Sequence, residues 1–580
     1  MENITIKING VSVSAPKDST ILDAARLAHI EIPTLCFLKE INEIGACRIC
    51  VVEVKGARSL VTSCVYPINE GMEVWTNTPK VLESRKMTLQ LILSNHRKEC
   101  LSCVRSGNCE LQQLCHDLNV DDEERFAGEA LESDIDETAA HMIRDNSKCI
   151  LCRRCTATCD KVQGVGVIGA NERGYNTHIS SAFEMGLGET SCVSCGQCIA
   201  VCPTGALQEK DNTKQVFDAI ADPDKYVVVQ TAPSVRAALG EEFGFPIGTN
   251  VEGKMAAALR RLGFDKVFDT DFGADLTIME EAHEFLDRVQ NGGVLPMITS
   301  CSPGWIKYCE HYYPDMLAHL SSCKSPQQMF GATLKTYYAE KMGIDPAKIV
   351  SVSVMPCTAK KFEIGRENQD AAGYADVDFV LTTRELARMI KRTGLRFTEL
   401  PEEEFDHPLG ESSGAAVIFG ATGGVMEAAL RTAVETLTGE SLDAVEFKEV
   451  RGTDGIKETT YHVAGMDVNI AVASGLTNAK TILERVKSGE ADYHFIEIMA
   501  CPGGCVNGGG QPIQSGTVRN HTDLKAQRAK ALYDQDAAMP IRKSHENPAI
   551  KKLYEEYLGE PGGHKAHELL HTTYVERSVN

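Results

Sequence analysis

Cysteine thiolates at short, regular spacings are the residues of this sequence best suited to chemistry. The chain has 22 cysteines among 580 residues, and most of them fall in tight groups. One pair, Cys501 and Cys505, lies among five glycines directly after an apolar run that predicts a buried strand ending at Met499. Because glycine lets the main chain wrap closely around a bulky group, this segment favours an iron–sulfur cofactor over a disulfide.

The strongest local pattern is a run of four cysteines that occurs twice with the same spacing. It resembles the runs of bacterial two-cluster ferredoxins, in which the fourth cysteine of each run binds the other cluster. The resemblance implies two [4Fe–4S] clusters, for which zinc is a remote alternative. The first cluster would be held by Cys149, Cys152, Cys155 and Cys202, and the second by Cys192, Cys195, Cys198 and Cys159.

Two smaller groups precede these runs. Cys36, Cys47, Cys50 and Cys64 resemble the ligands of plant-type [2Fe–2S] ferredoxins, with a first gap closer to that of respiratory complex I. A tetrathiolate zinc site is the alternative, because its spacing is the same.

The second group combines one histidine with three cysteines, within a helical pattern over residues 81–119. It resembles the His/Cys3-ligated [4Fe–4S] domain of large hydrogenases and complex I, and zinc is again the alternative. The implied ligands are His96, Cys100, Cys103 and Cys109. We expect Cys115 to be a small buried hydrophobic residue.

The elements that position these groups change in character along the chain. Residues 1–80 alternate apolar and polar positions around a hairpin signal at Asn9 and Gly10, followed by a helix over 19–29. After residue 214, strand and helix patterns alternate, which predicts an α/β region in two lobes with substantial parallel sheet. The expected strands are 226–230, 294–298, 349–354, 379–381, 417–419, 469–472 and 494–498, and 384–391 is an expected helix.

We therefore predict a multidomain α+β and α/β chain of four units. These are a [2Fe–2S] ferredoxin-like domain (1–80), a His/Cys3 [4Fe–4S] domain (81–135), a two-cluster ferredoxin-like domain (136–213) and a catalytic domain with a C-terminal tail (214–580). The net charge of -22 disfavours binding to nucleic acid and anionic membranes. Without a signal peptide or a long apolar run, we expect a cytoplasmic protein that does not span a membrane.

Three motifs in the catalytic part resemble those of the [FeFe]-hydrogenases, over residues 299–305, 355–363 and 497–508. With the ferredoxin-like units, the resemblance covers nearly the whole chain. It implies an H-cluster, in which a [4Fe–4S] cubane is joined through a cysteine sulfur to a di-iron unit with CO, cyanide and a dithiolate. It also implies that Cys357, Cys501 and Cys505 bind the cubane, with Cys505 bridging, and that Lys360 donates to a cyanide. Residues implied to line the di-iron pocket are Pro233, Ser234, Gln327, Met355 and Met499.

The first motif departs from the commonest family pattern of two adjacent cysteines, of which the first relays protons and the second binds the cubane. Here Cys301 is followed by Ser302. Either Ser302 binds the cubane, or Cys301 becomes the ligand and gives up the relay. Cys323 is a third candidate ligand.

The resemblance also implies a proton relay to the buried metal, built from titratable groups. A predicted helix over 276–288 places Glu281 and Glu284 on one face. The relay would run from the surface through Arg288 and Glu284 to Ser321, Glu281 and the thiol of Cys301. Acidic residues on a helix more often form a solvated face, which is the structural alternative.

The implied function is reversible reduction of protons to H₂, with one [2Fe–2S], three accessory [4Fe–4S] clusters and the H-cluster as cofactors. Ferredoxin is the implied electron partner, and separate maturases would install the di-iron unit. A close alternative is the catalytic subunit of a multisubunit, electron-bifurcating hydrogenase. Flavin and NAD(P) would then bind partner subunits, because no dinucleotide fingerprint occurs in a suitable context. A hydrogen sensor and a non-catalytic iron–sulfur assembly relative are further alternatives.

Overall fold

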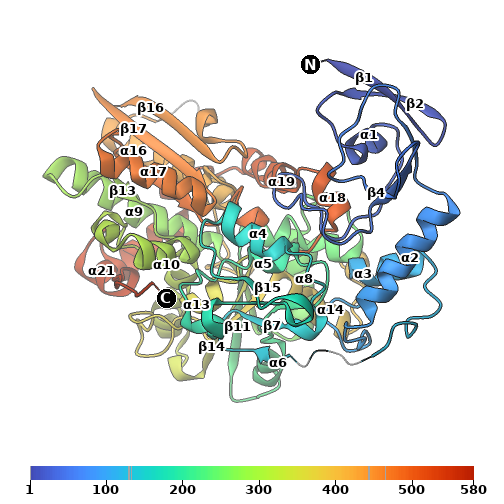
Figure 1. Ribbon diagram of the computed structural model, residues 1–580. Coiled ribbons are helices and arrows are strands. Elements are labelled where there is room, and N and C mark those ends of the chain that lie inside the picture. The colour runs from blue at the N-terminus through green and yellow to red at the C-terminus, as the bar shows by residue number, and fades with distance from the viewer. Residues whose placement is uncertain (1, 129–130, 132, 442–444, 464, 580) are drawn as a thin grey trace.

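The computed structural model describes residues 2–128, 131, 133–441, 445–463 and 465–579. Figure 1 shows the N-terminal segment standing at one end of the molecule, while the catalytic part forms a larger body. The segment that carries the two ferredoxin-like runs lies against that body (Figure 1). Among the residues described, no helix has the length and apolar character that crossing a membrane requires.

The N-terminal segment folds into a five-stranded sheet with one helix. Its elements are β1 (Asn3–Ile8), β2 (Val11–Pro16), α1 (Ile21–Leu27), β3 (Val51–Val54), β4 (Val61–Thr62) and β5 (Glu73–Trp75). The strand order is β2-β1-β5-β3-β4. The predicted hairpin is confirmed, because β1 and β2 pair antiparallel around Asn9 and Gly10, which both have positive φ. The helix begins at a capping box formed by Thr20 and Asp23.

The next segment contains α2 (Pro79–Leu93) and α3 (Glu110–Asp117). The single helical pattern expected over 81–119 is wrong in its middle, because α2 ends before His96 and α3 begins after Cys109. The histidine and its three cysteines therefore lie in turns between two helices, and not one helical turn apart. Cys115 is half-buried on α3, so the expectation of full burial is also wrong.

The ferredoxin-like segment combines short strands and short helices. Its elements are β6 (Ile135–Asp136), β7 (Met142–Asp145), α4 (Arg154–Ala157), β8 (Gly169–Asn171), β9 (His178–Ser180), α5 (Gln197–Val201) and β10 (Leu207–Glu209). Strand β7 pairs antiparallel with β10 and β6, and β8 pairs with β9. Glu209, at the end of β10, forms buried ion pairs with Arg384 (2.6 Å) and Arg388 (2.7 Å) of the catalytic part. These pairs tie the two units together.

The first catalytic lobe is built on a parallel sheet in the order β12-β11-β14-β15. Every residue of its strand β14 is buried, as a strand covered on both faces requires. The lobe consists of α6 (Thr213–Ile220), β11 (Tyr226–Thr231), α7 (Pro233–Arg236), α8 (Glu252–Leu262), β12 (Lys266–Asp269), β14 (Ile349–Met355), α13 (Lys360–Glu363), β15 (Phe379–Thr382) and α14 (Thr383–Arg392).

The second lobe carries a mixed sheet in the order β13-β18-β17-β16, in which only β16 runs antiparallel to its neighbour. Its elements are α9 (Asp271–Asn291), β13 (Met297–Ile298), α10 (Pro303–Tyr312), α11 (Pro326–Thr333), α12 (Ala339–Met342), α15 (Gly414–Val417), α16 (Gly424–Thr438), β16 (Ile456–Val463), β17 (Met466–Ser474), α17 (Leu476–Ser488) and β18 (Phe495–Met499). The strand expected over 417–419 is wrong, since these residues end α15 and continue as a 3-10 helix. A short apolar run fits a buried helix equally well.

The chain ends in four helices that cover the catalytic part. They are α18 (Gly516–His521), α19 (Leu524–Ala538), α20 (Pro548–Leu553) and α21 (His564–Leu570). Ile550, Leu553 and Leu570 are buried in the same cluster as Phe272 of α9. The last residues then run past α10, where the Arg577 guanidinium pairs with the buried Glu310 carboxylate (2.5 Å).

Candidate active site and accessory cluster sites

The two ferredoxin-like runs surround two separate cavities. Cys159, Cys192, Cys195 and Cys198 line the first, and Cys149, Cys152, Cys155 and Cys202 line the second. Each cavity thus receives three cysteines from one run and the fourth from the other. The structure brings together both four-cysteine groups as the ferredoxin resemblance implied.

The four N-terminal cysteines also converge. The sulfurs of Cys50 and Cys64 lie 3.3 Å apart. The pKa of Cys47 is lowered to about 6, chiefly by a hydrogen bond from Cys36 and against the effect of burial. A thiolate stabilised in this way is the form that binds metal.

His96 is held as a neutral imidazole. Burial is the main cause that lowers its pKa to about 4, and its Nδ1 has no hydrogen-bond partner among the residues described. A neutral ring with an unpartnered nitrogen suits metal ligation. Close packing also brings this group to the ferredoxin-like segment, because a Cβ on Gly205 would lie 2.6 Å from the sulfur of Cys103.

The catalytic cavity lies beyond the carboxyl ends of β11, β14 and β18, where ligands bind in such sheets. It has a volume of about 60 Å³, larger than a single water needs. The five predicted pocket residues Pro233, Ser234, Gln327, Met355 and Met499 all line it, together with Cys301, Cys357, Lys360 and Cys505. Phe419, which the sequence did not single out, completes one wall from the 3-10 helix after α15.

Glycine permits the loops around this cavity to approach one another. A Cβ on Gly508 would lie 2.2 Å from the Pro356 carbonyl oxygen, and one on Gly509 would lie 2.3 Å from the Cys195 carbonyl oxygen. The loops that carry Cys357 and Cys505 are therefore in contact with each other and with the nearer accessory cavity. Burial, followed by the charges of Cys357, Cys195 and Cys505, raises the pKa of Cys501. These sulfurs are close neighbours in the fold.

The two adjacent residues of the first motif face different surroundings. Cys301 lines the catalytic cavity, and burial and then the Glu281 charge raise its pKa well above the ordinary value. The Ser302 hydroxyl accepts a hydrogen bond from the amide of Ala500 (3.2 Å), next to Cys501. Cys323 lies elsewhere, with its thiol donating to Glu284 Oε2 over 3.7 Å.

Lys360 reaches the cavity from the start of α13. Its Nζ donates to the Ser325 hydroxyl (2.7 Å) and to the Cys301 carbonyl (3.3 Å), and it pairs with Glu363 Oε2 at 2.8 Å. Glu363 also accepts from the Gln327 amide (3.0 Å), a role that the sequence did not reveal. The ammonium is thereby fixed at the cavity wall.

Comparisons with known proteins agree with this geometry. The chain is 52% identical to an NADP-reducing hydrogenase subunit of Solidesulfovibrio fructosivorans, over all of both chains. It is 45% identical to iron hydrogenase 1 of Clostridium pasteurianum, over 98% of this chain and 99% of that one. The model of the iron-only hydrogenase large subunit, C-terminal domain, matches residues 225–509. The chain belongs to the iron-only hydrogenase family.

A solved structure and four further family models match separate parts of this hydrogenase. The [FeFe]-hydrogenase of Chlamydomonas reinhardtii, in its apo form, superposes with a TM-score of 0.57 at 46% identity, over 64% of this chain and all of that one. Family models match a 2Fe–2S cluster-binding domain (1–79), the iron–sulfur region of the NADH-ubiquinone oxidoreductase G subunit (85–124), a 4Fe–4S dicluster domain (148–206) and the iron hydrogenase small subunit (522–577). The chain is thus an iron hydrogenase with accessory iron–sulfur domains, and the predicted fold class is confirmed.

Hydrogen bonds join three of the predicted relay residues of the hydrogenase, Arg288, Glu284 and Ser321. Arg288 donates to Glu284 Oε1 (2.6 Å), and the Ser321 hydroxyl donates to Glu284 Oε2 (2.9 Å). Glu281 is fully buried one turn earlier on α9. Burial, and then the charge of Glu284, raises its pKa to about 8.

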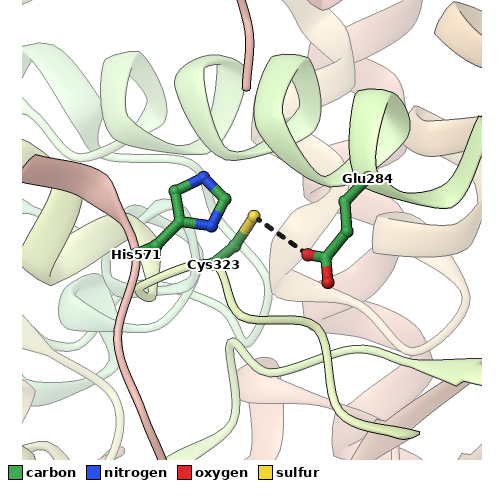
Figure 2. Close-up of side chains that lie close together, drawn as sticks. All are labelled: Glu284, Cys323 and His571. Atoms are coloured by element: carbon green, nitrogen blue, oxygen red, sulfur yellow. Dashed lines mark hydrogen bonds between the residues drawn. The ribbon is translucent and has the colours of Figure 1, made fainter. Parts of the chain in front are cut away.

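The C-terminal segment of the hydrogenase adds residues that the sequence did not predict. Figure 2 shows the His571 imidazole, the Cys323 thiol and the Glu284 carboxylate facing one another. The Tyr574 hydroxyl donates to the Ser321 carbonyl (2.5 Å). The contacts of Tyr574 with Ser321 and of His571 with Ser322 join positions 253 and 249 residues apart, so no local pattern could have revealed them.

Proposed function

We propose that this hydrogenase holds an H-cluster at the described cavity and catalyses the reversible reduction of protons to H₂. The observation that carries the proposal is the meeting of Cys357, Cys501 and Cys505 beside a cavity that is also reached by Lys360 and Cys301. The donor set fits the cofactor, because soft thiolates bind iron–sulfur clusters. When bound, the H-cluster would supply the iron at which hydrogen is formed and split.

Within this proposal, Cys357, Cys501 and Cys505 would hold the cubane, and Cys505 would also hold the di-iron unit. The surroundings of the first motif favour Ser302 as the fourth cubane ligand, because its hydroxyl accepts a hydrogen bond from the amide of Ala500, the residue before Cys501. Cys301 then keeps the relay position, because it faces the cavity and feels the charge of Glu281. Cys323, whose thiol donates a hydrogen bond to Glu284, is not proposed as a cubane ligand.

The cavity wall orients the di-iron unit and excludes water. Lys360, fixed by Glu363 and Ser325, would offer its ammonium to a cyanide as a charge-assisted donor. Gln327 is held in place by the Ser353 hydroxyl, which donates to its Oε1 over 2.8 Å. Pro233, Met355 and Met499 supply apolar contact and shape. The Ser234 hydroxyl donates to the Gly420 carbonyl (3.3 Å).

Protons would pass from Arg288 and Glu284 through Ser321 and Glu281 to the Cys301 thiol. A pKa near 8 keeps Glu281 protonated at neutral pH, so it can donate to one neighbour and then be reloaded from the other. The Ser321 side chain and the Ser300 backbone act on the Glu281 carboxyl, which places Ser321 within reach for this transfer.

Electrons would enter through one [2Fe–2S] and three accessory [4Fe–4S] clusters in the units 1–80, 81–135 and 136–213, with 214–580 as the catalytic unit. The proximity of Cys195 to Cys501 supports transfer from the last of these clusters. We propose ferredoxin as the electron partner, maturases for the di-iron unit and a cytoplasmic location, where all 22 cysteines would remain reduced.

A second candidate is the catalytic subunit of an NADP-linked complex. It is favoured by the 52% identity, over the whole chain, to a subunit of an NADP-reducing hydrogenase. Flavin and NAD(P) would then bind partner subunits.

The test is anaerobic expression together with the maturases, followed by infrared spectroscopy and hydrogen assays. Bands of iron-bound CO and cyanide, with H₂ formation from reduced ferredoxin, are expected. Activity with NADPH only after co-purification of partner subunits would identify the complex. Protein that carries its accessory clusters but shows neither bands nor H₂ after maturation would contradict the proposal.

A further inference from the structure

Glu284 of the proposed relay belongs to a cluster of three side chains that could bind a metal, and the other two have no role in the sites assigned above. Glu284 of α9, Cys323 and His571 each offer one ligand atom, and these atoms all lie within 4.8 Å of one another (Figure 2). Cys323 is buried, and the side chains of Glu284 and His571 are 16% and 6% exposed. Three separate segments of the chain therefore converge on one point.

The histidine is oriented as a metal-binding histidine would be. Its Nε2 donates to Glu280 Oε2 (3.1 Å), because a carboxylate can only accept. Glu280 is itself fixed by the Tyr554 hydroxyl and by the amide of Gly562 (2.9 Å). With the proton held on Nε2, the lone pair of Nδ1 is the one able to bind a metal. A carboxylate behind a ligating histidine is the usual support of a zinc site.

We propose that Glu284, Cys323 and His571 form a site for Zn²⁺ or a chemically similar divalent cation. One thiolate, one imidazole and one carboxylate are zinc ligands, and a water would complete a tetrahedron. Ligand atoms around a tetrahedral zinc lie about 3.5 Å apart, so closure needs side-chain movements of about 1 Å. The Ser322 hydroxyl, now 2.8 Å from Nδ1, would give way to the metal.

Binding would block proton transfer, an inference that rests on the relay proposed above. The metal would occupy Glu284 Oε2, which now accepts from the Ser321 hydroxyl. With that acceptor taken, Glu284 could no longer exchange a proton with Ser321. Zinc is therefore expected to inhibit hydrogen turnover reversibly.

The test uses matured holoenzyme, so that cluster cysteines are occupied, in buffer without thiols. Hydrogen turnover is measured against zinc concentration as a ratio to the zinc-free activity of the same variant. For Cys323→Ser and His571→Gln, the zinc concentration for half-inhibition should rise at least about 10-fold, and for Glu280→Gln by about 10- to 100-fold. The matched controls are Cys309→Ser, a buried cysteine outside the cluster, and His567→Gln, whose ring stacks on His571.

X-ray absorption at the zinc edge provides the second readout. The site is supported if each zinc has one sulfur at about 2.3 Å and this sulfur is absent in Cys323→Ser. It is also supported if zinc inhibits the control variants at the same concentration as the wild type. Zinc with no sulfur, or equal inhibition of all variants, overturns the proposal. Zinc bound through one sulfur without loss of turnover overturns the inhibitory role and the relay through Glu284. If Cys323→Ser does not fold, His571→Gln and Glu280→Gln still decide.

Discussion

Replacing Glu281 by glutamine keeps the shape of a buried side chain but removes its exchangeable carboxyl proton. The structure raises the pKa of this group from 4.5 to about 8, mainly because the side chain is buried. The difference corresponds to a preference of about 5 kcal/mol for the neutral form. At pH 7 the wild-type side chain is thus neutral, and an amide replaces it without adding or removing charge.

Two outcomes follow, and they separate a relay role from a structural one. Hydrogen evolution from a reduced dye should fall by about 10²-fold or more in Glu281→Gln, while the infrared bands of bound CO and cyanide persist. In the wild type, activity should decline above about pH 8, as Glu281 loses its proton. The variant should lack that step in its pH profile.

The raised pKa of Glu281 also fixes the direction in which the stability of the folded protein changes with pH. Between pH 4.5 and about 8, folded protein binds more protons at Glu281 than unfolded protein does, so wild-type stability falls as pH rises through this window. The variant escapes this loss, and its melting temperature should gain on the wild type as pH increases. Asp287→Asn, an exposed acid on the same helix, is the control and should behave as wild type. If Glu281→Gln keeps wild-type activity and pH profile, the relay assignment is refuted.

Three further perturbations test other parts of the site. Ser302→Cys should raise the reduction potential of the cubane, since a thiolate is a softer, less basic ligand than a serine oxygen; an unchanged potential and EPR signal would exclude Ser302 as a ligand. Combining Cys149→Ser with Cys202→Ser should remove one [4Fe–4S] cluster by EPR and iron content, because both line one cavity, whereas loss of two clusters would contradict the crossed arrangement. Glu209→Ala should lower the free energy of unfolding by about 3–5 kcal/mol, because it removes the buried carboxylate that pairs with both Arg384 and Arg388. Asp218→Ala breaks the exposed pair with Lys214 and should lower the free energy of unfolding by less than about 1 kcal/mol. Both free energies are measured by thermal unfolding.

The sequence predicted best where chemistry demands a fixed local spacing. The ligands of a cluster must sit at short intervals, so Cys149 to Cys159 could be assigned to clusters before any fold was known. Burial of β14 was equally readable, because a strand covered on both faces is apolar throughout. The pattern over 417–419 failed for the same reason, since a short apolar run suits a buried helix as well as a strand.

Contacts between distant segments could not be predicted in this way. His571 and Glu280 meet only because the C-terminal helices pack on α9, and neither residue carries a local pattern that indicates the other. The sequence also could not decide which of Cys301 and Ser302 binds the cubane and which relays protons, because the two residues are adjacent in one motif and differ in the direction they face. In the structure the two residues have different surroundings. Cys301 lines the cavity and is affected by the charge of Glu281, whereas the Ser302 hydroxyl accepts a hydrogen bond from the Ala500 amide.

These separate surroundings suggest why the first motif needs two neighbouring polar residues. Protons and electrons must both reach the catalytic cavity, and they come from different partners. The charge of Glu281, a member of the proposed relay, acts on Cys301, whereas Cys501 lies near Cys195 of the nearer accessory cavity. A group on the relay side must gain and lose a proton in each cycle, and a cluster ligand must not. Under the proposed assignment, dividing these tasks between Cys301 and Ser302 would let the relay thiol titrate without releasing iron.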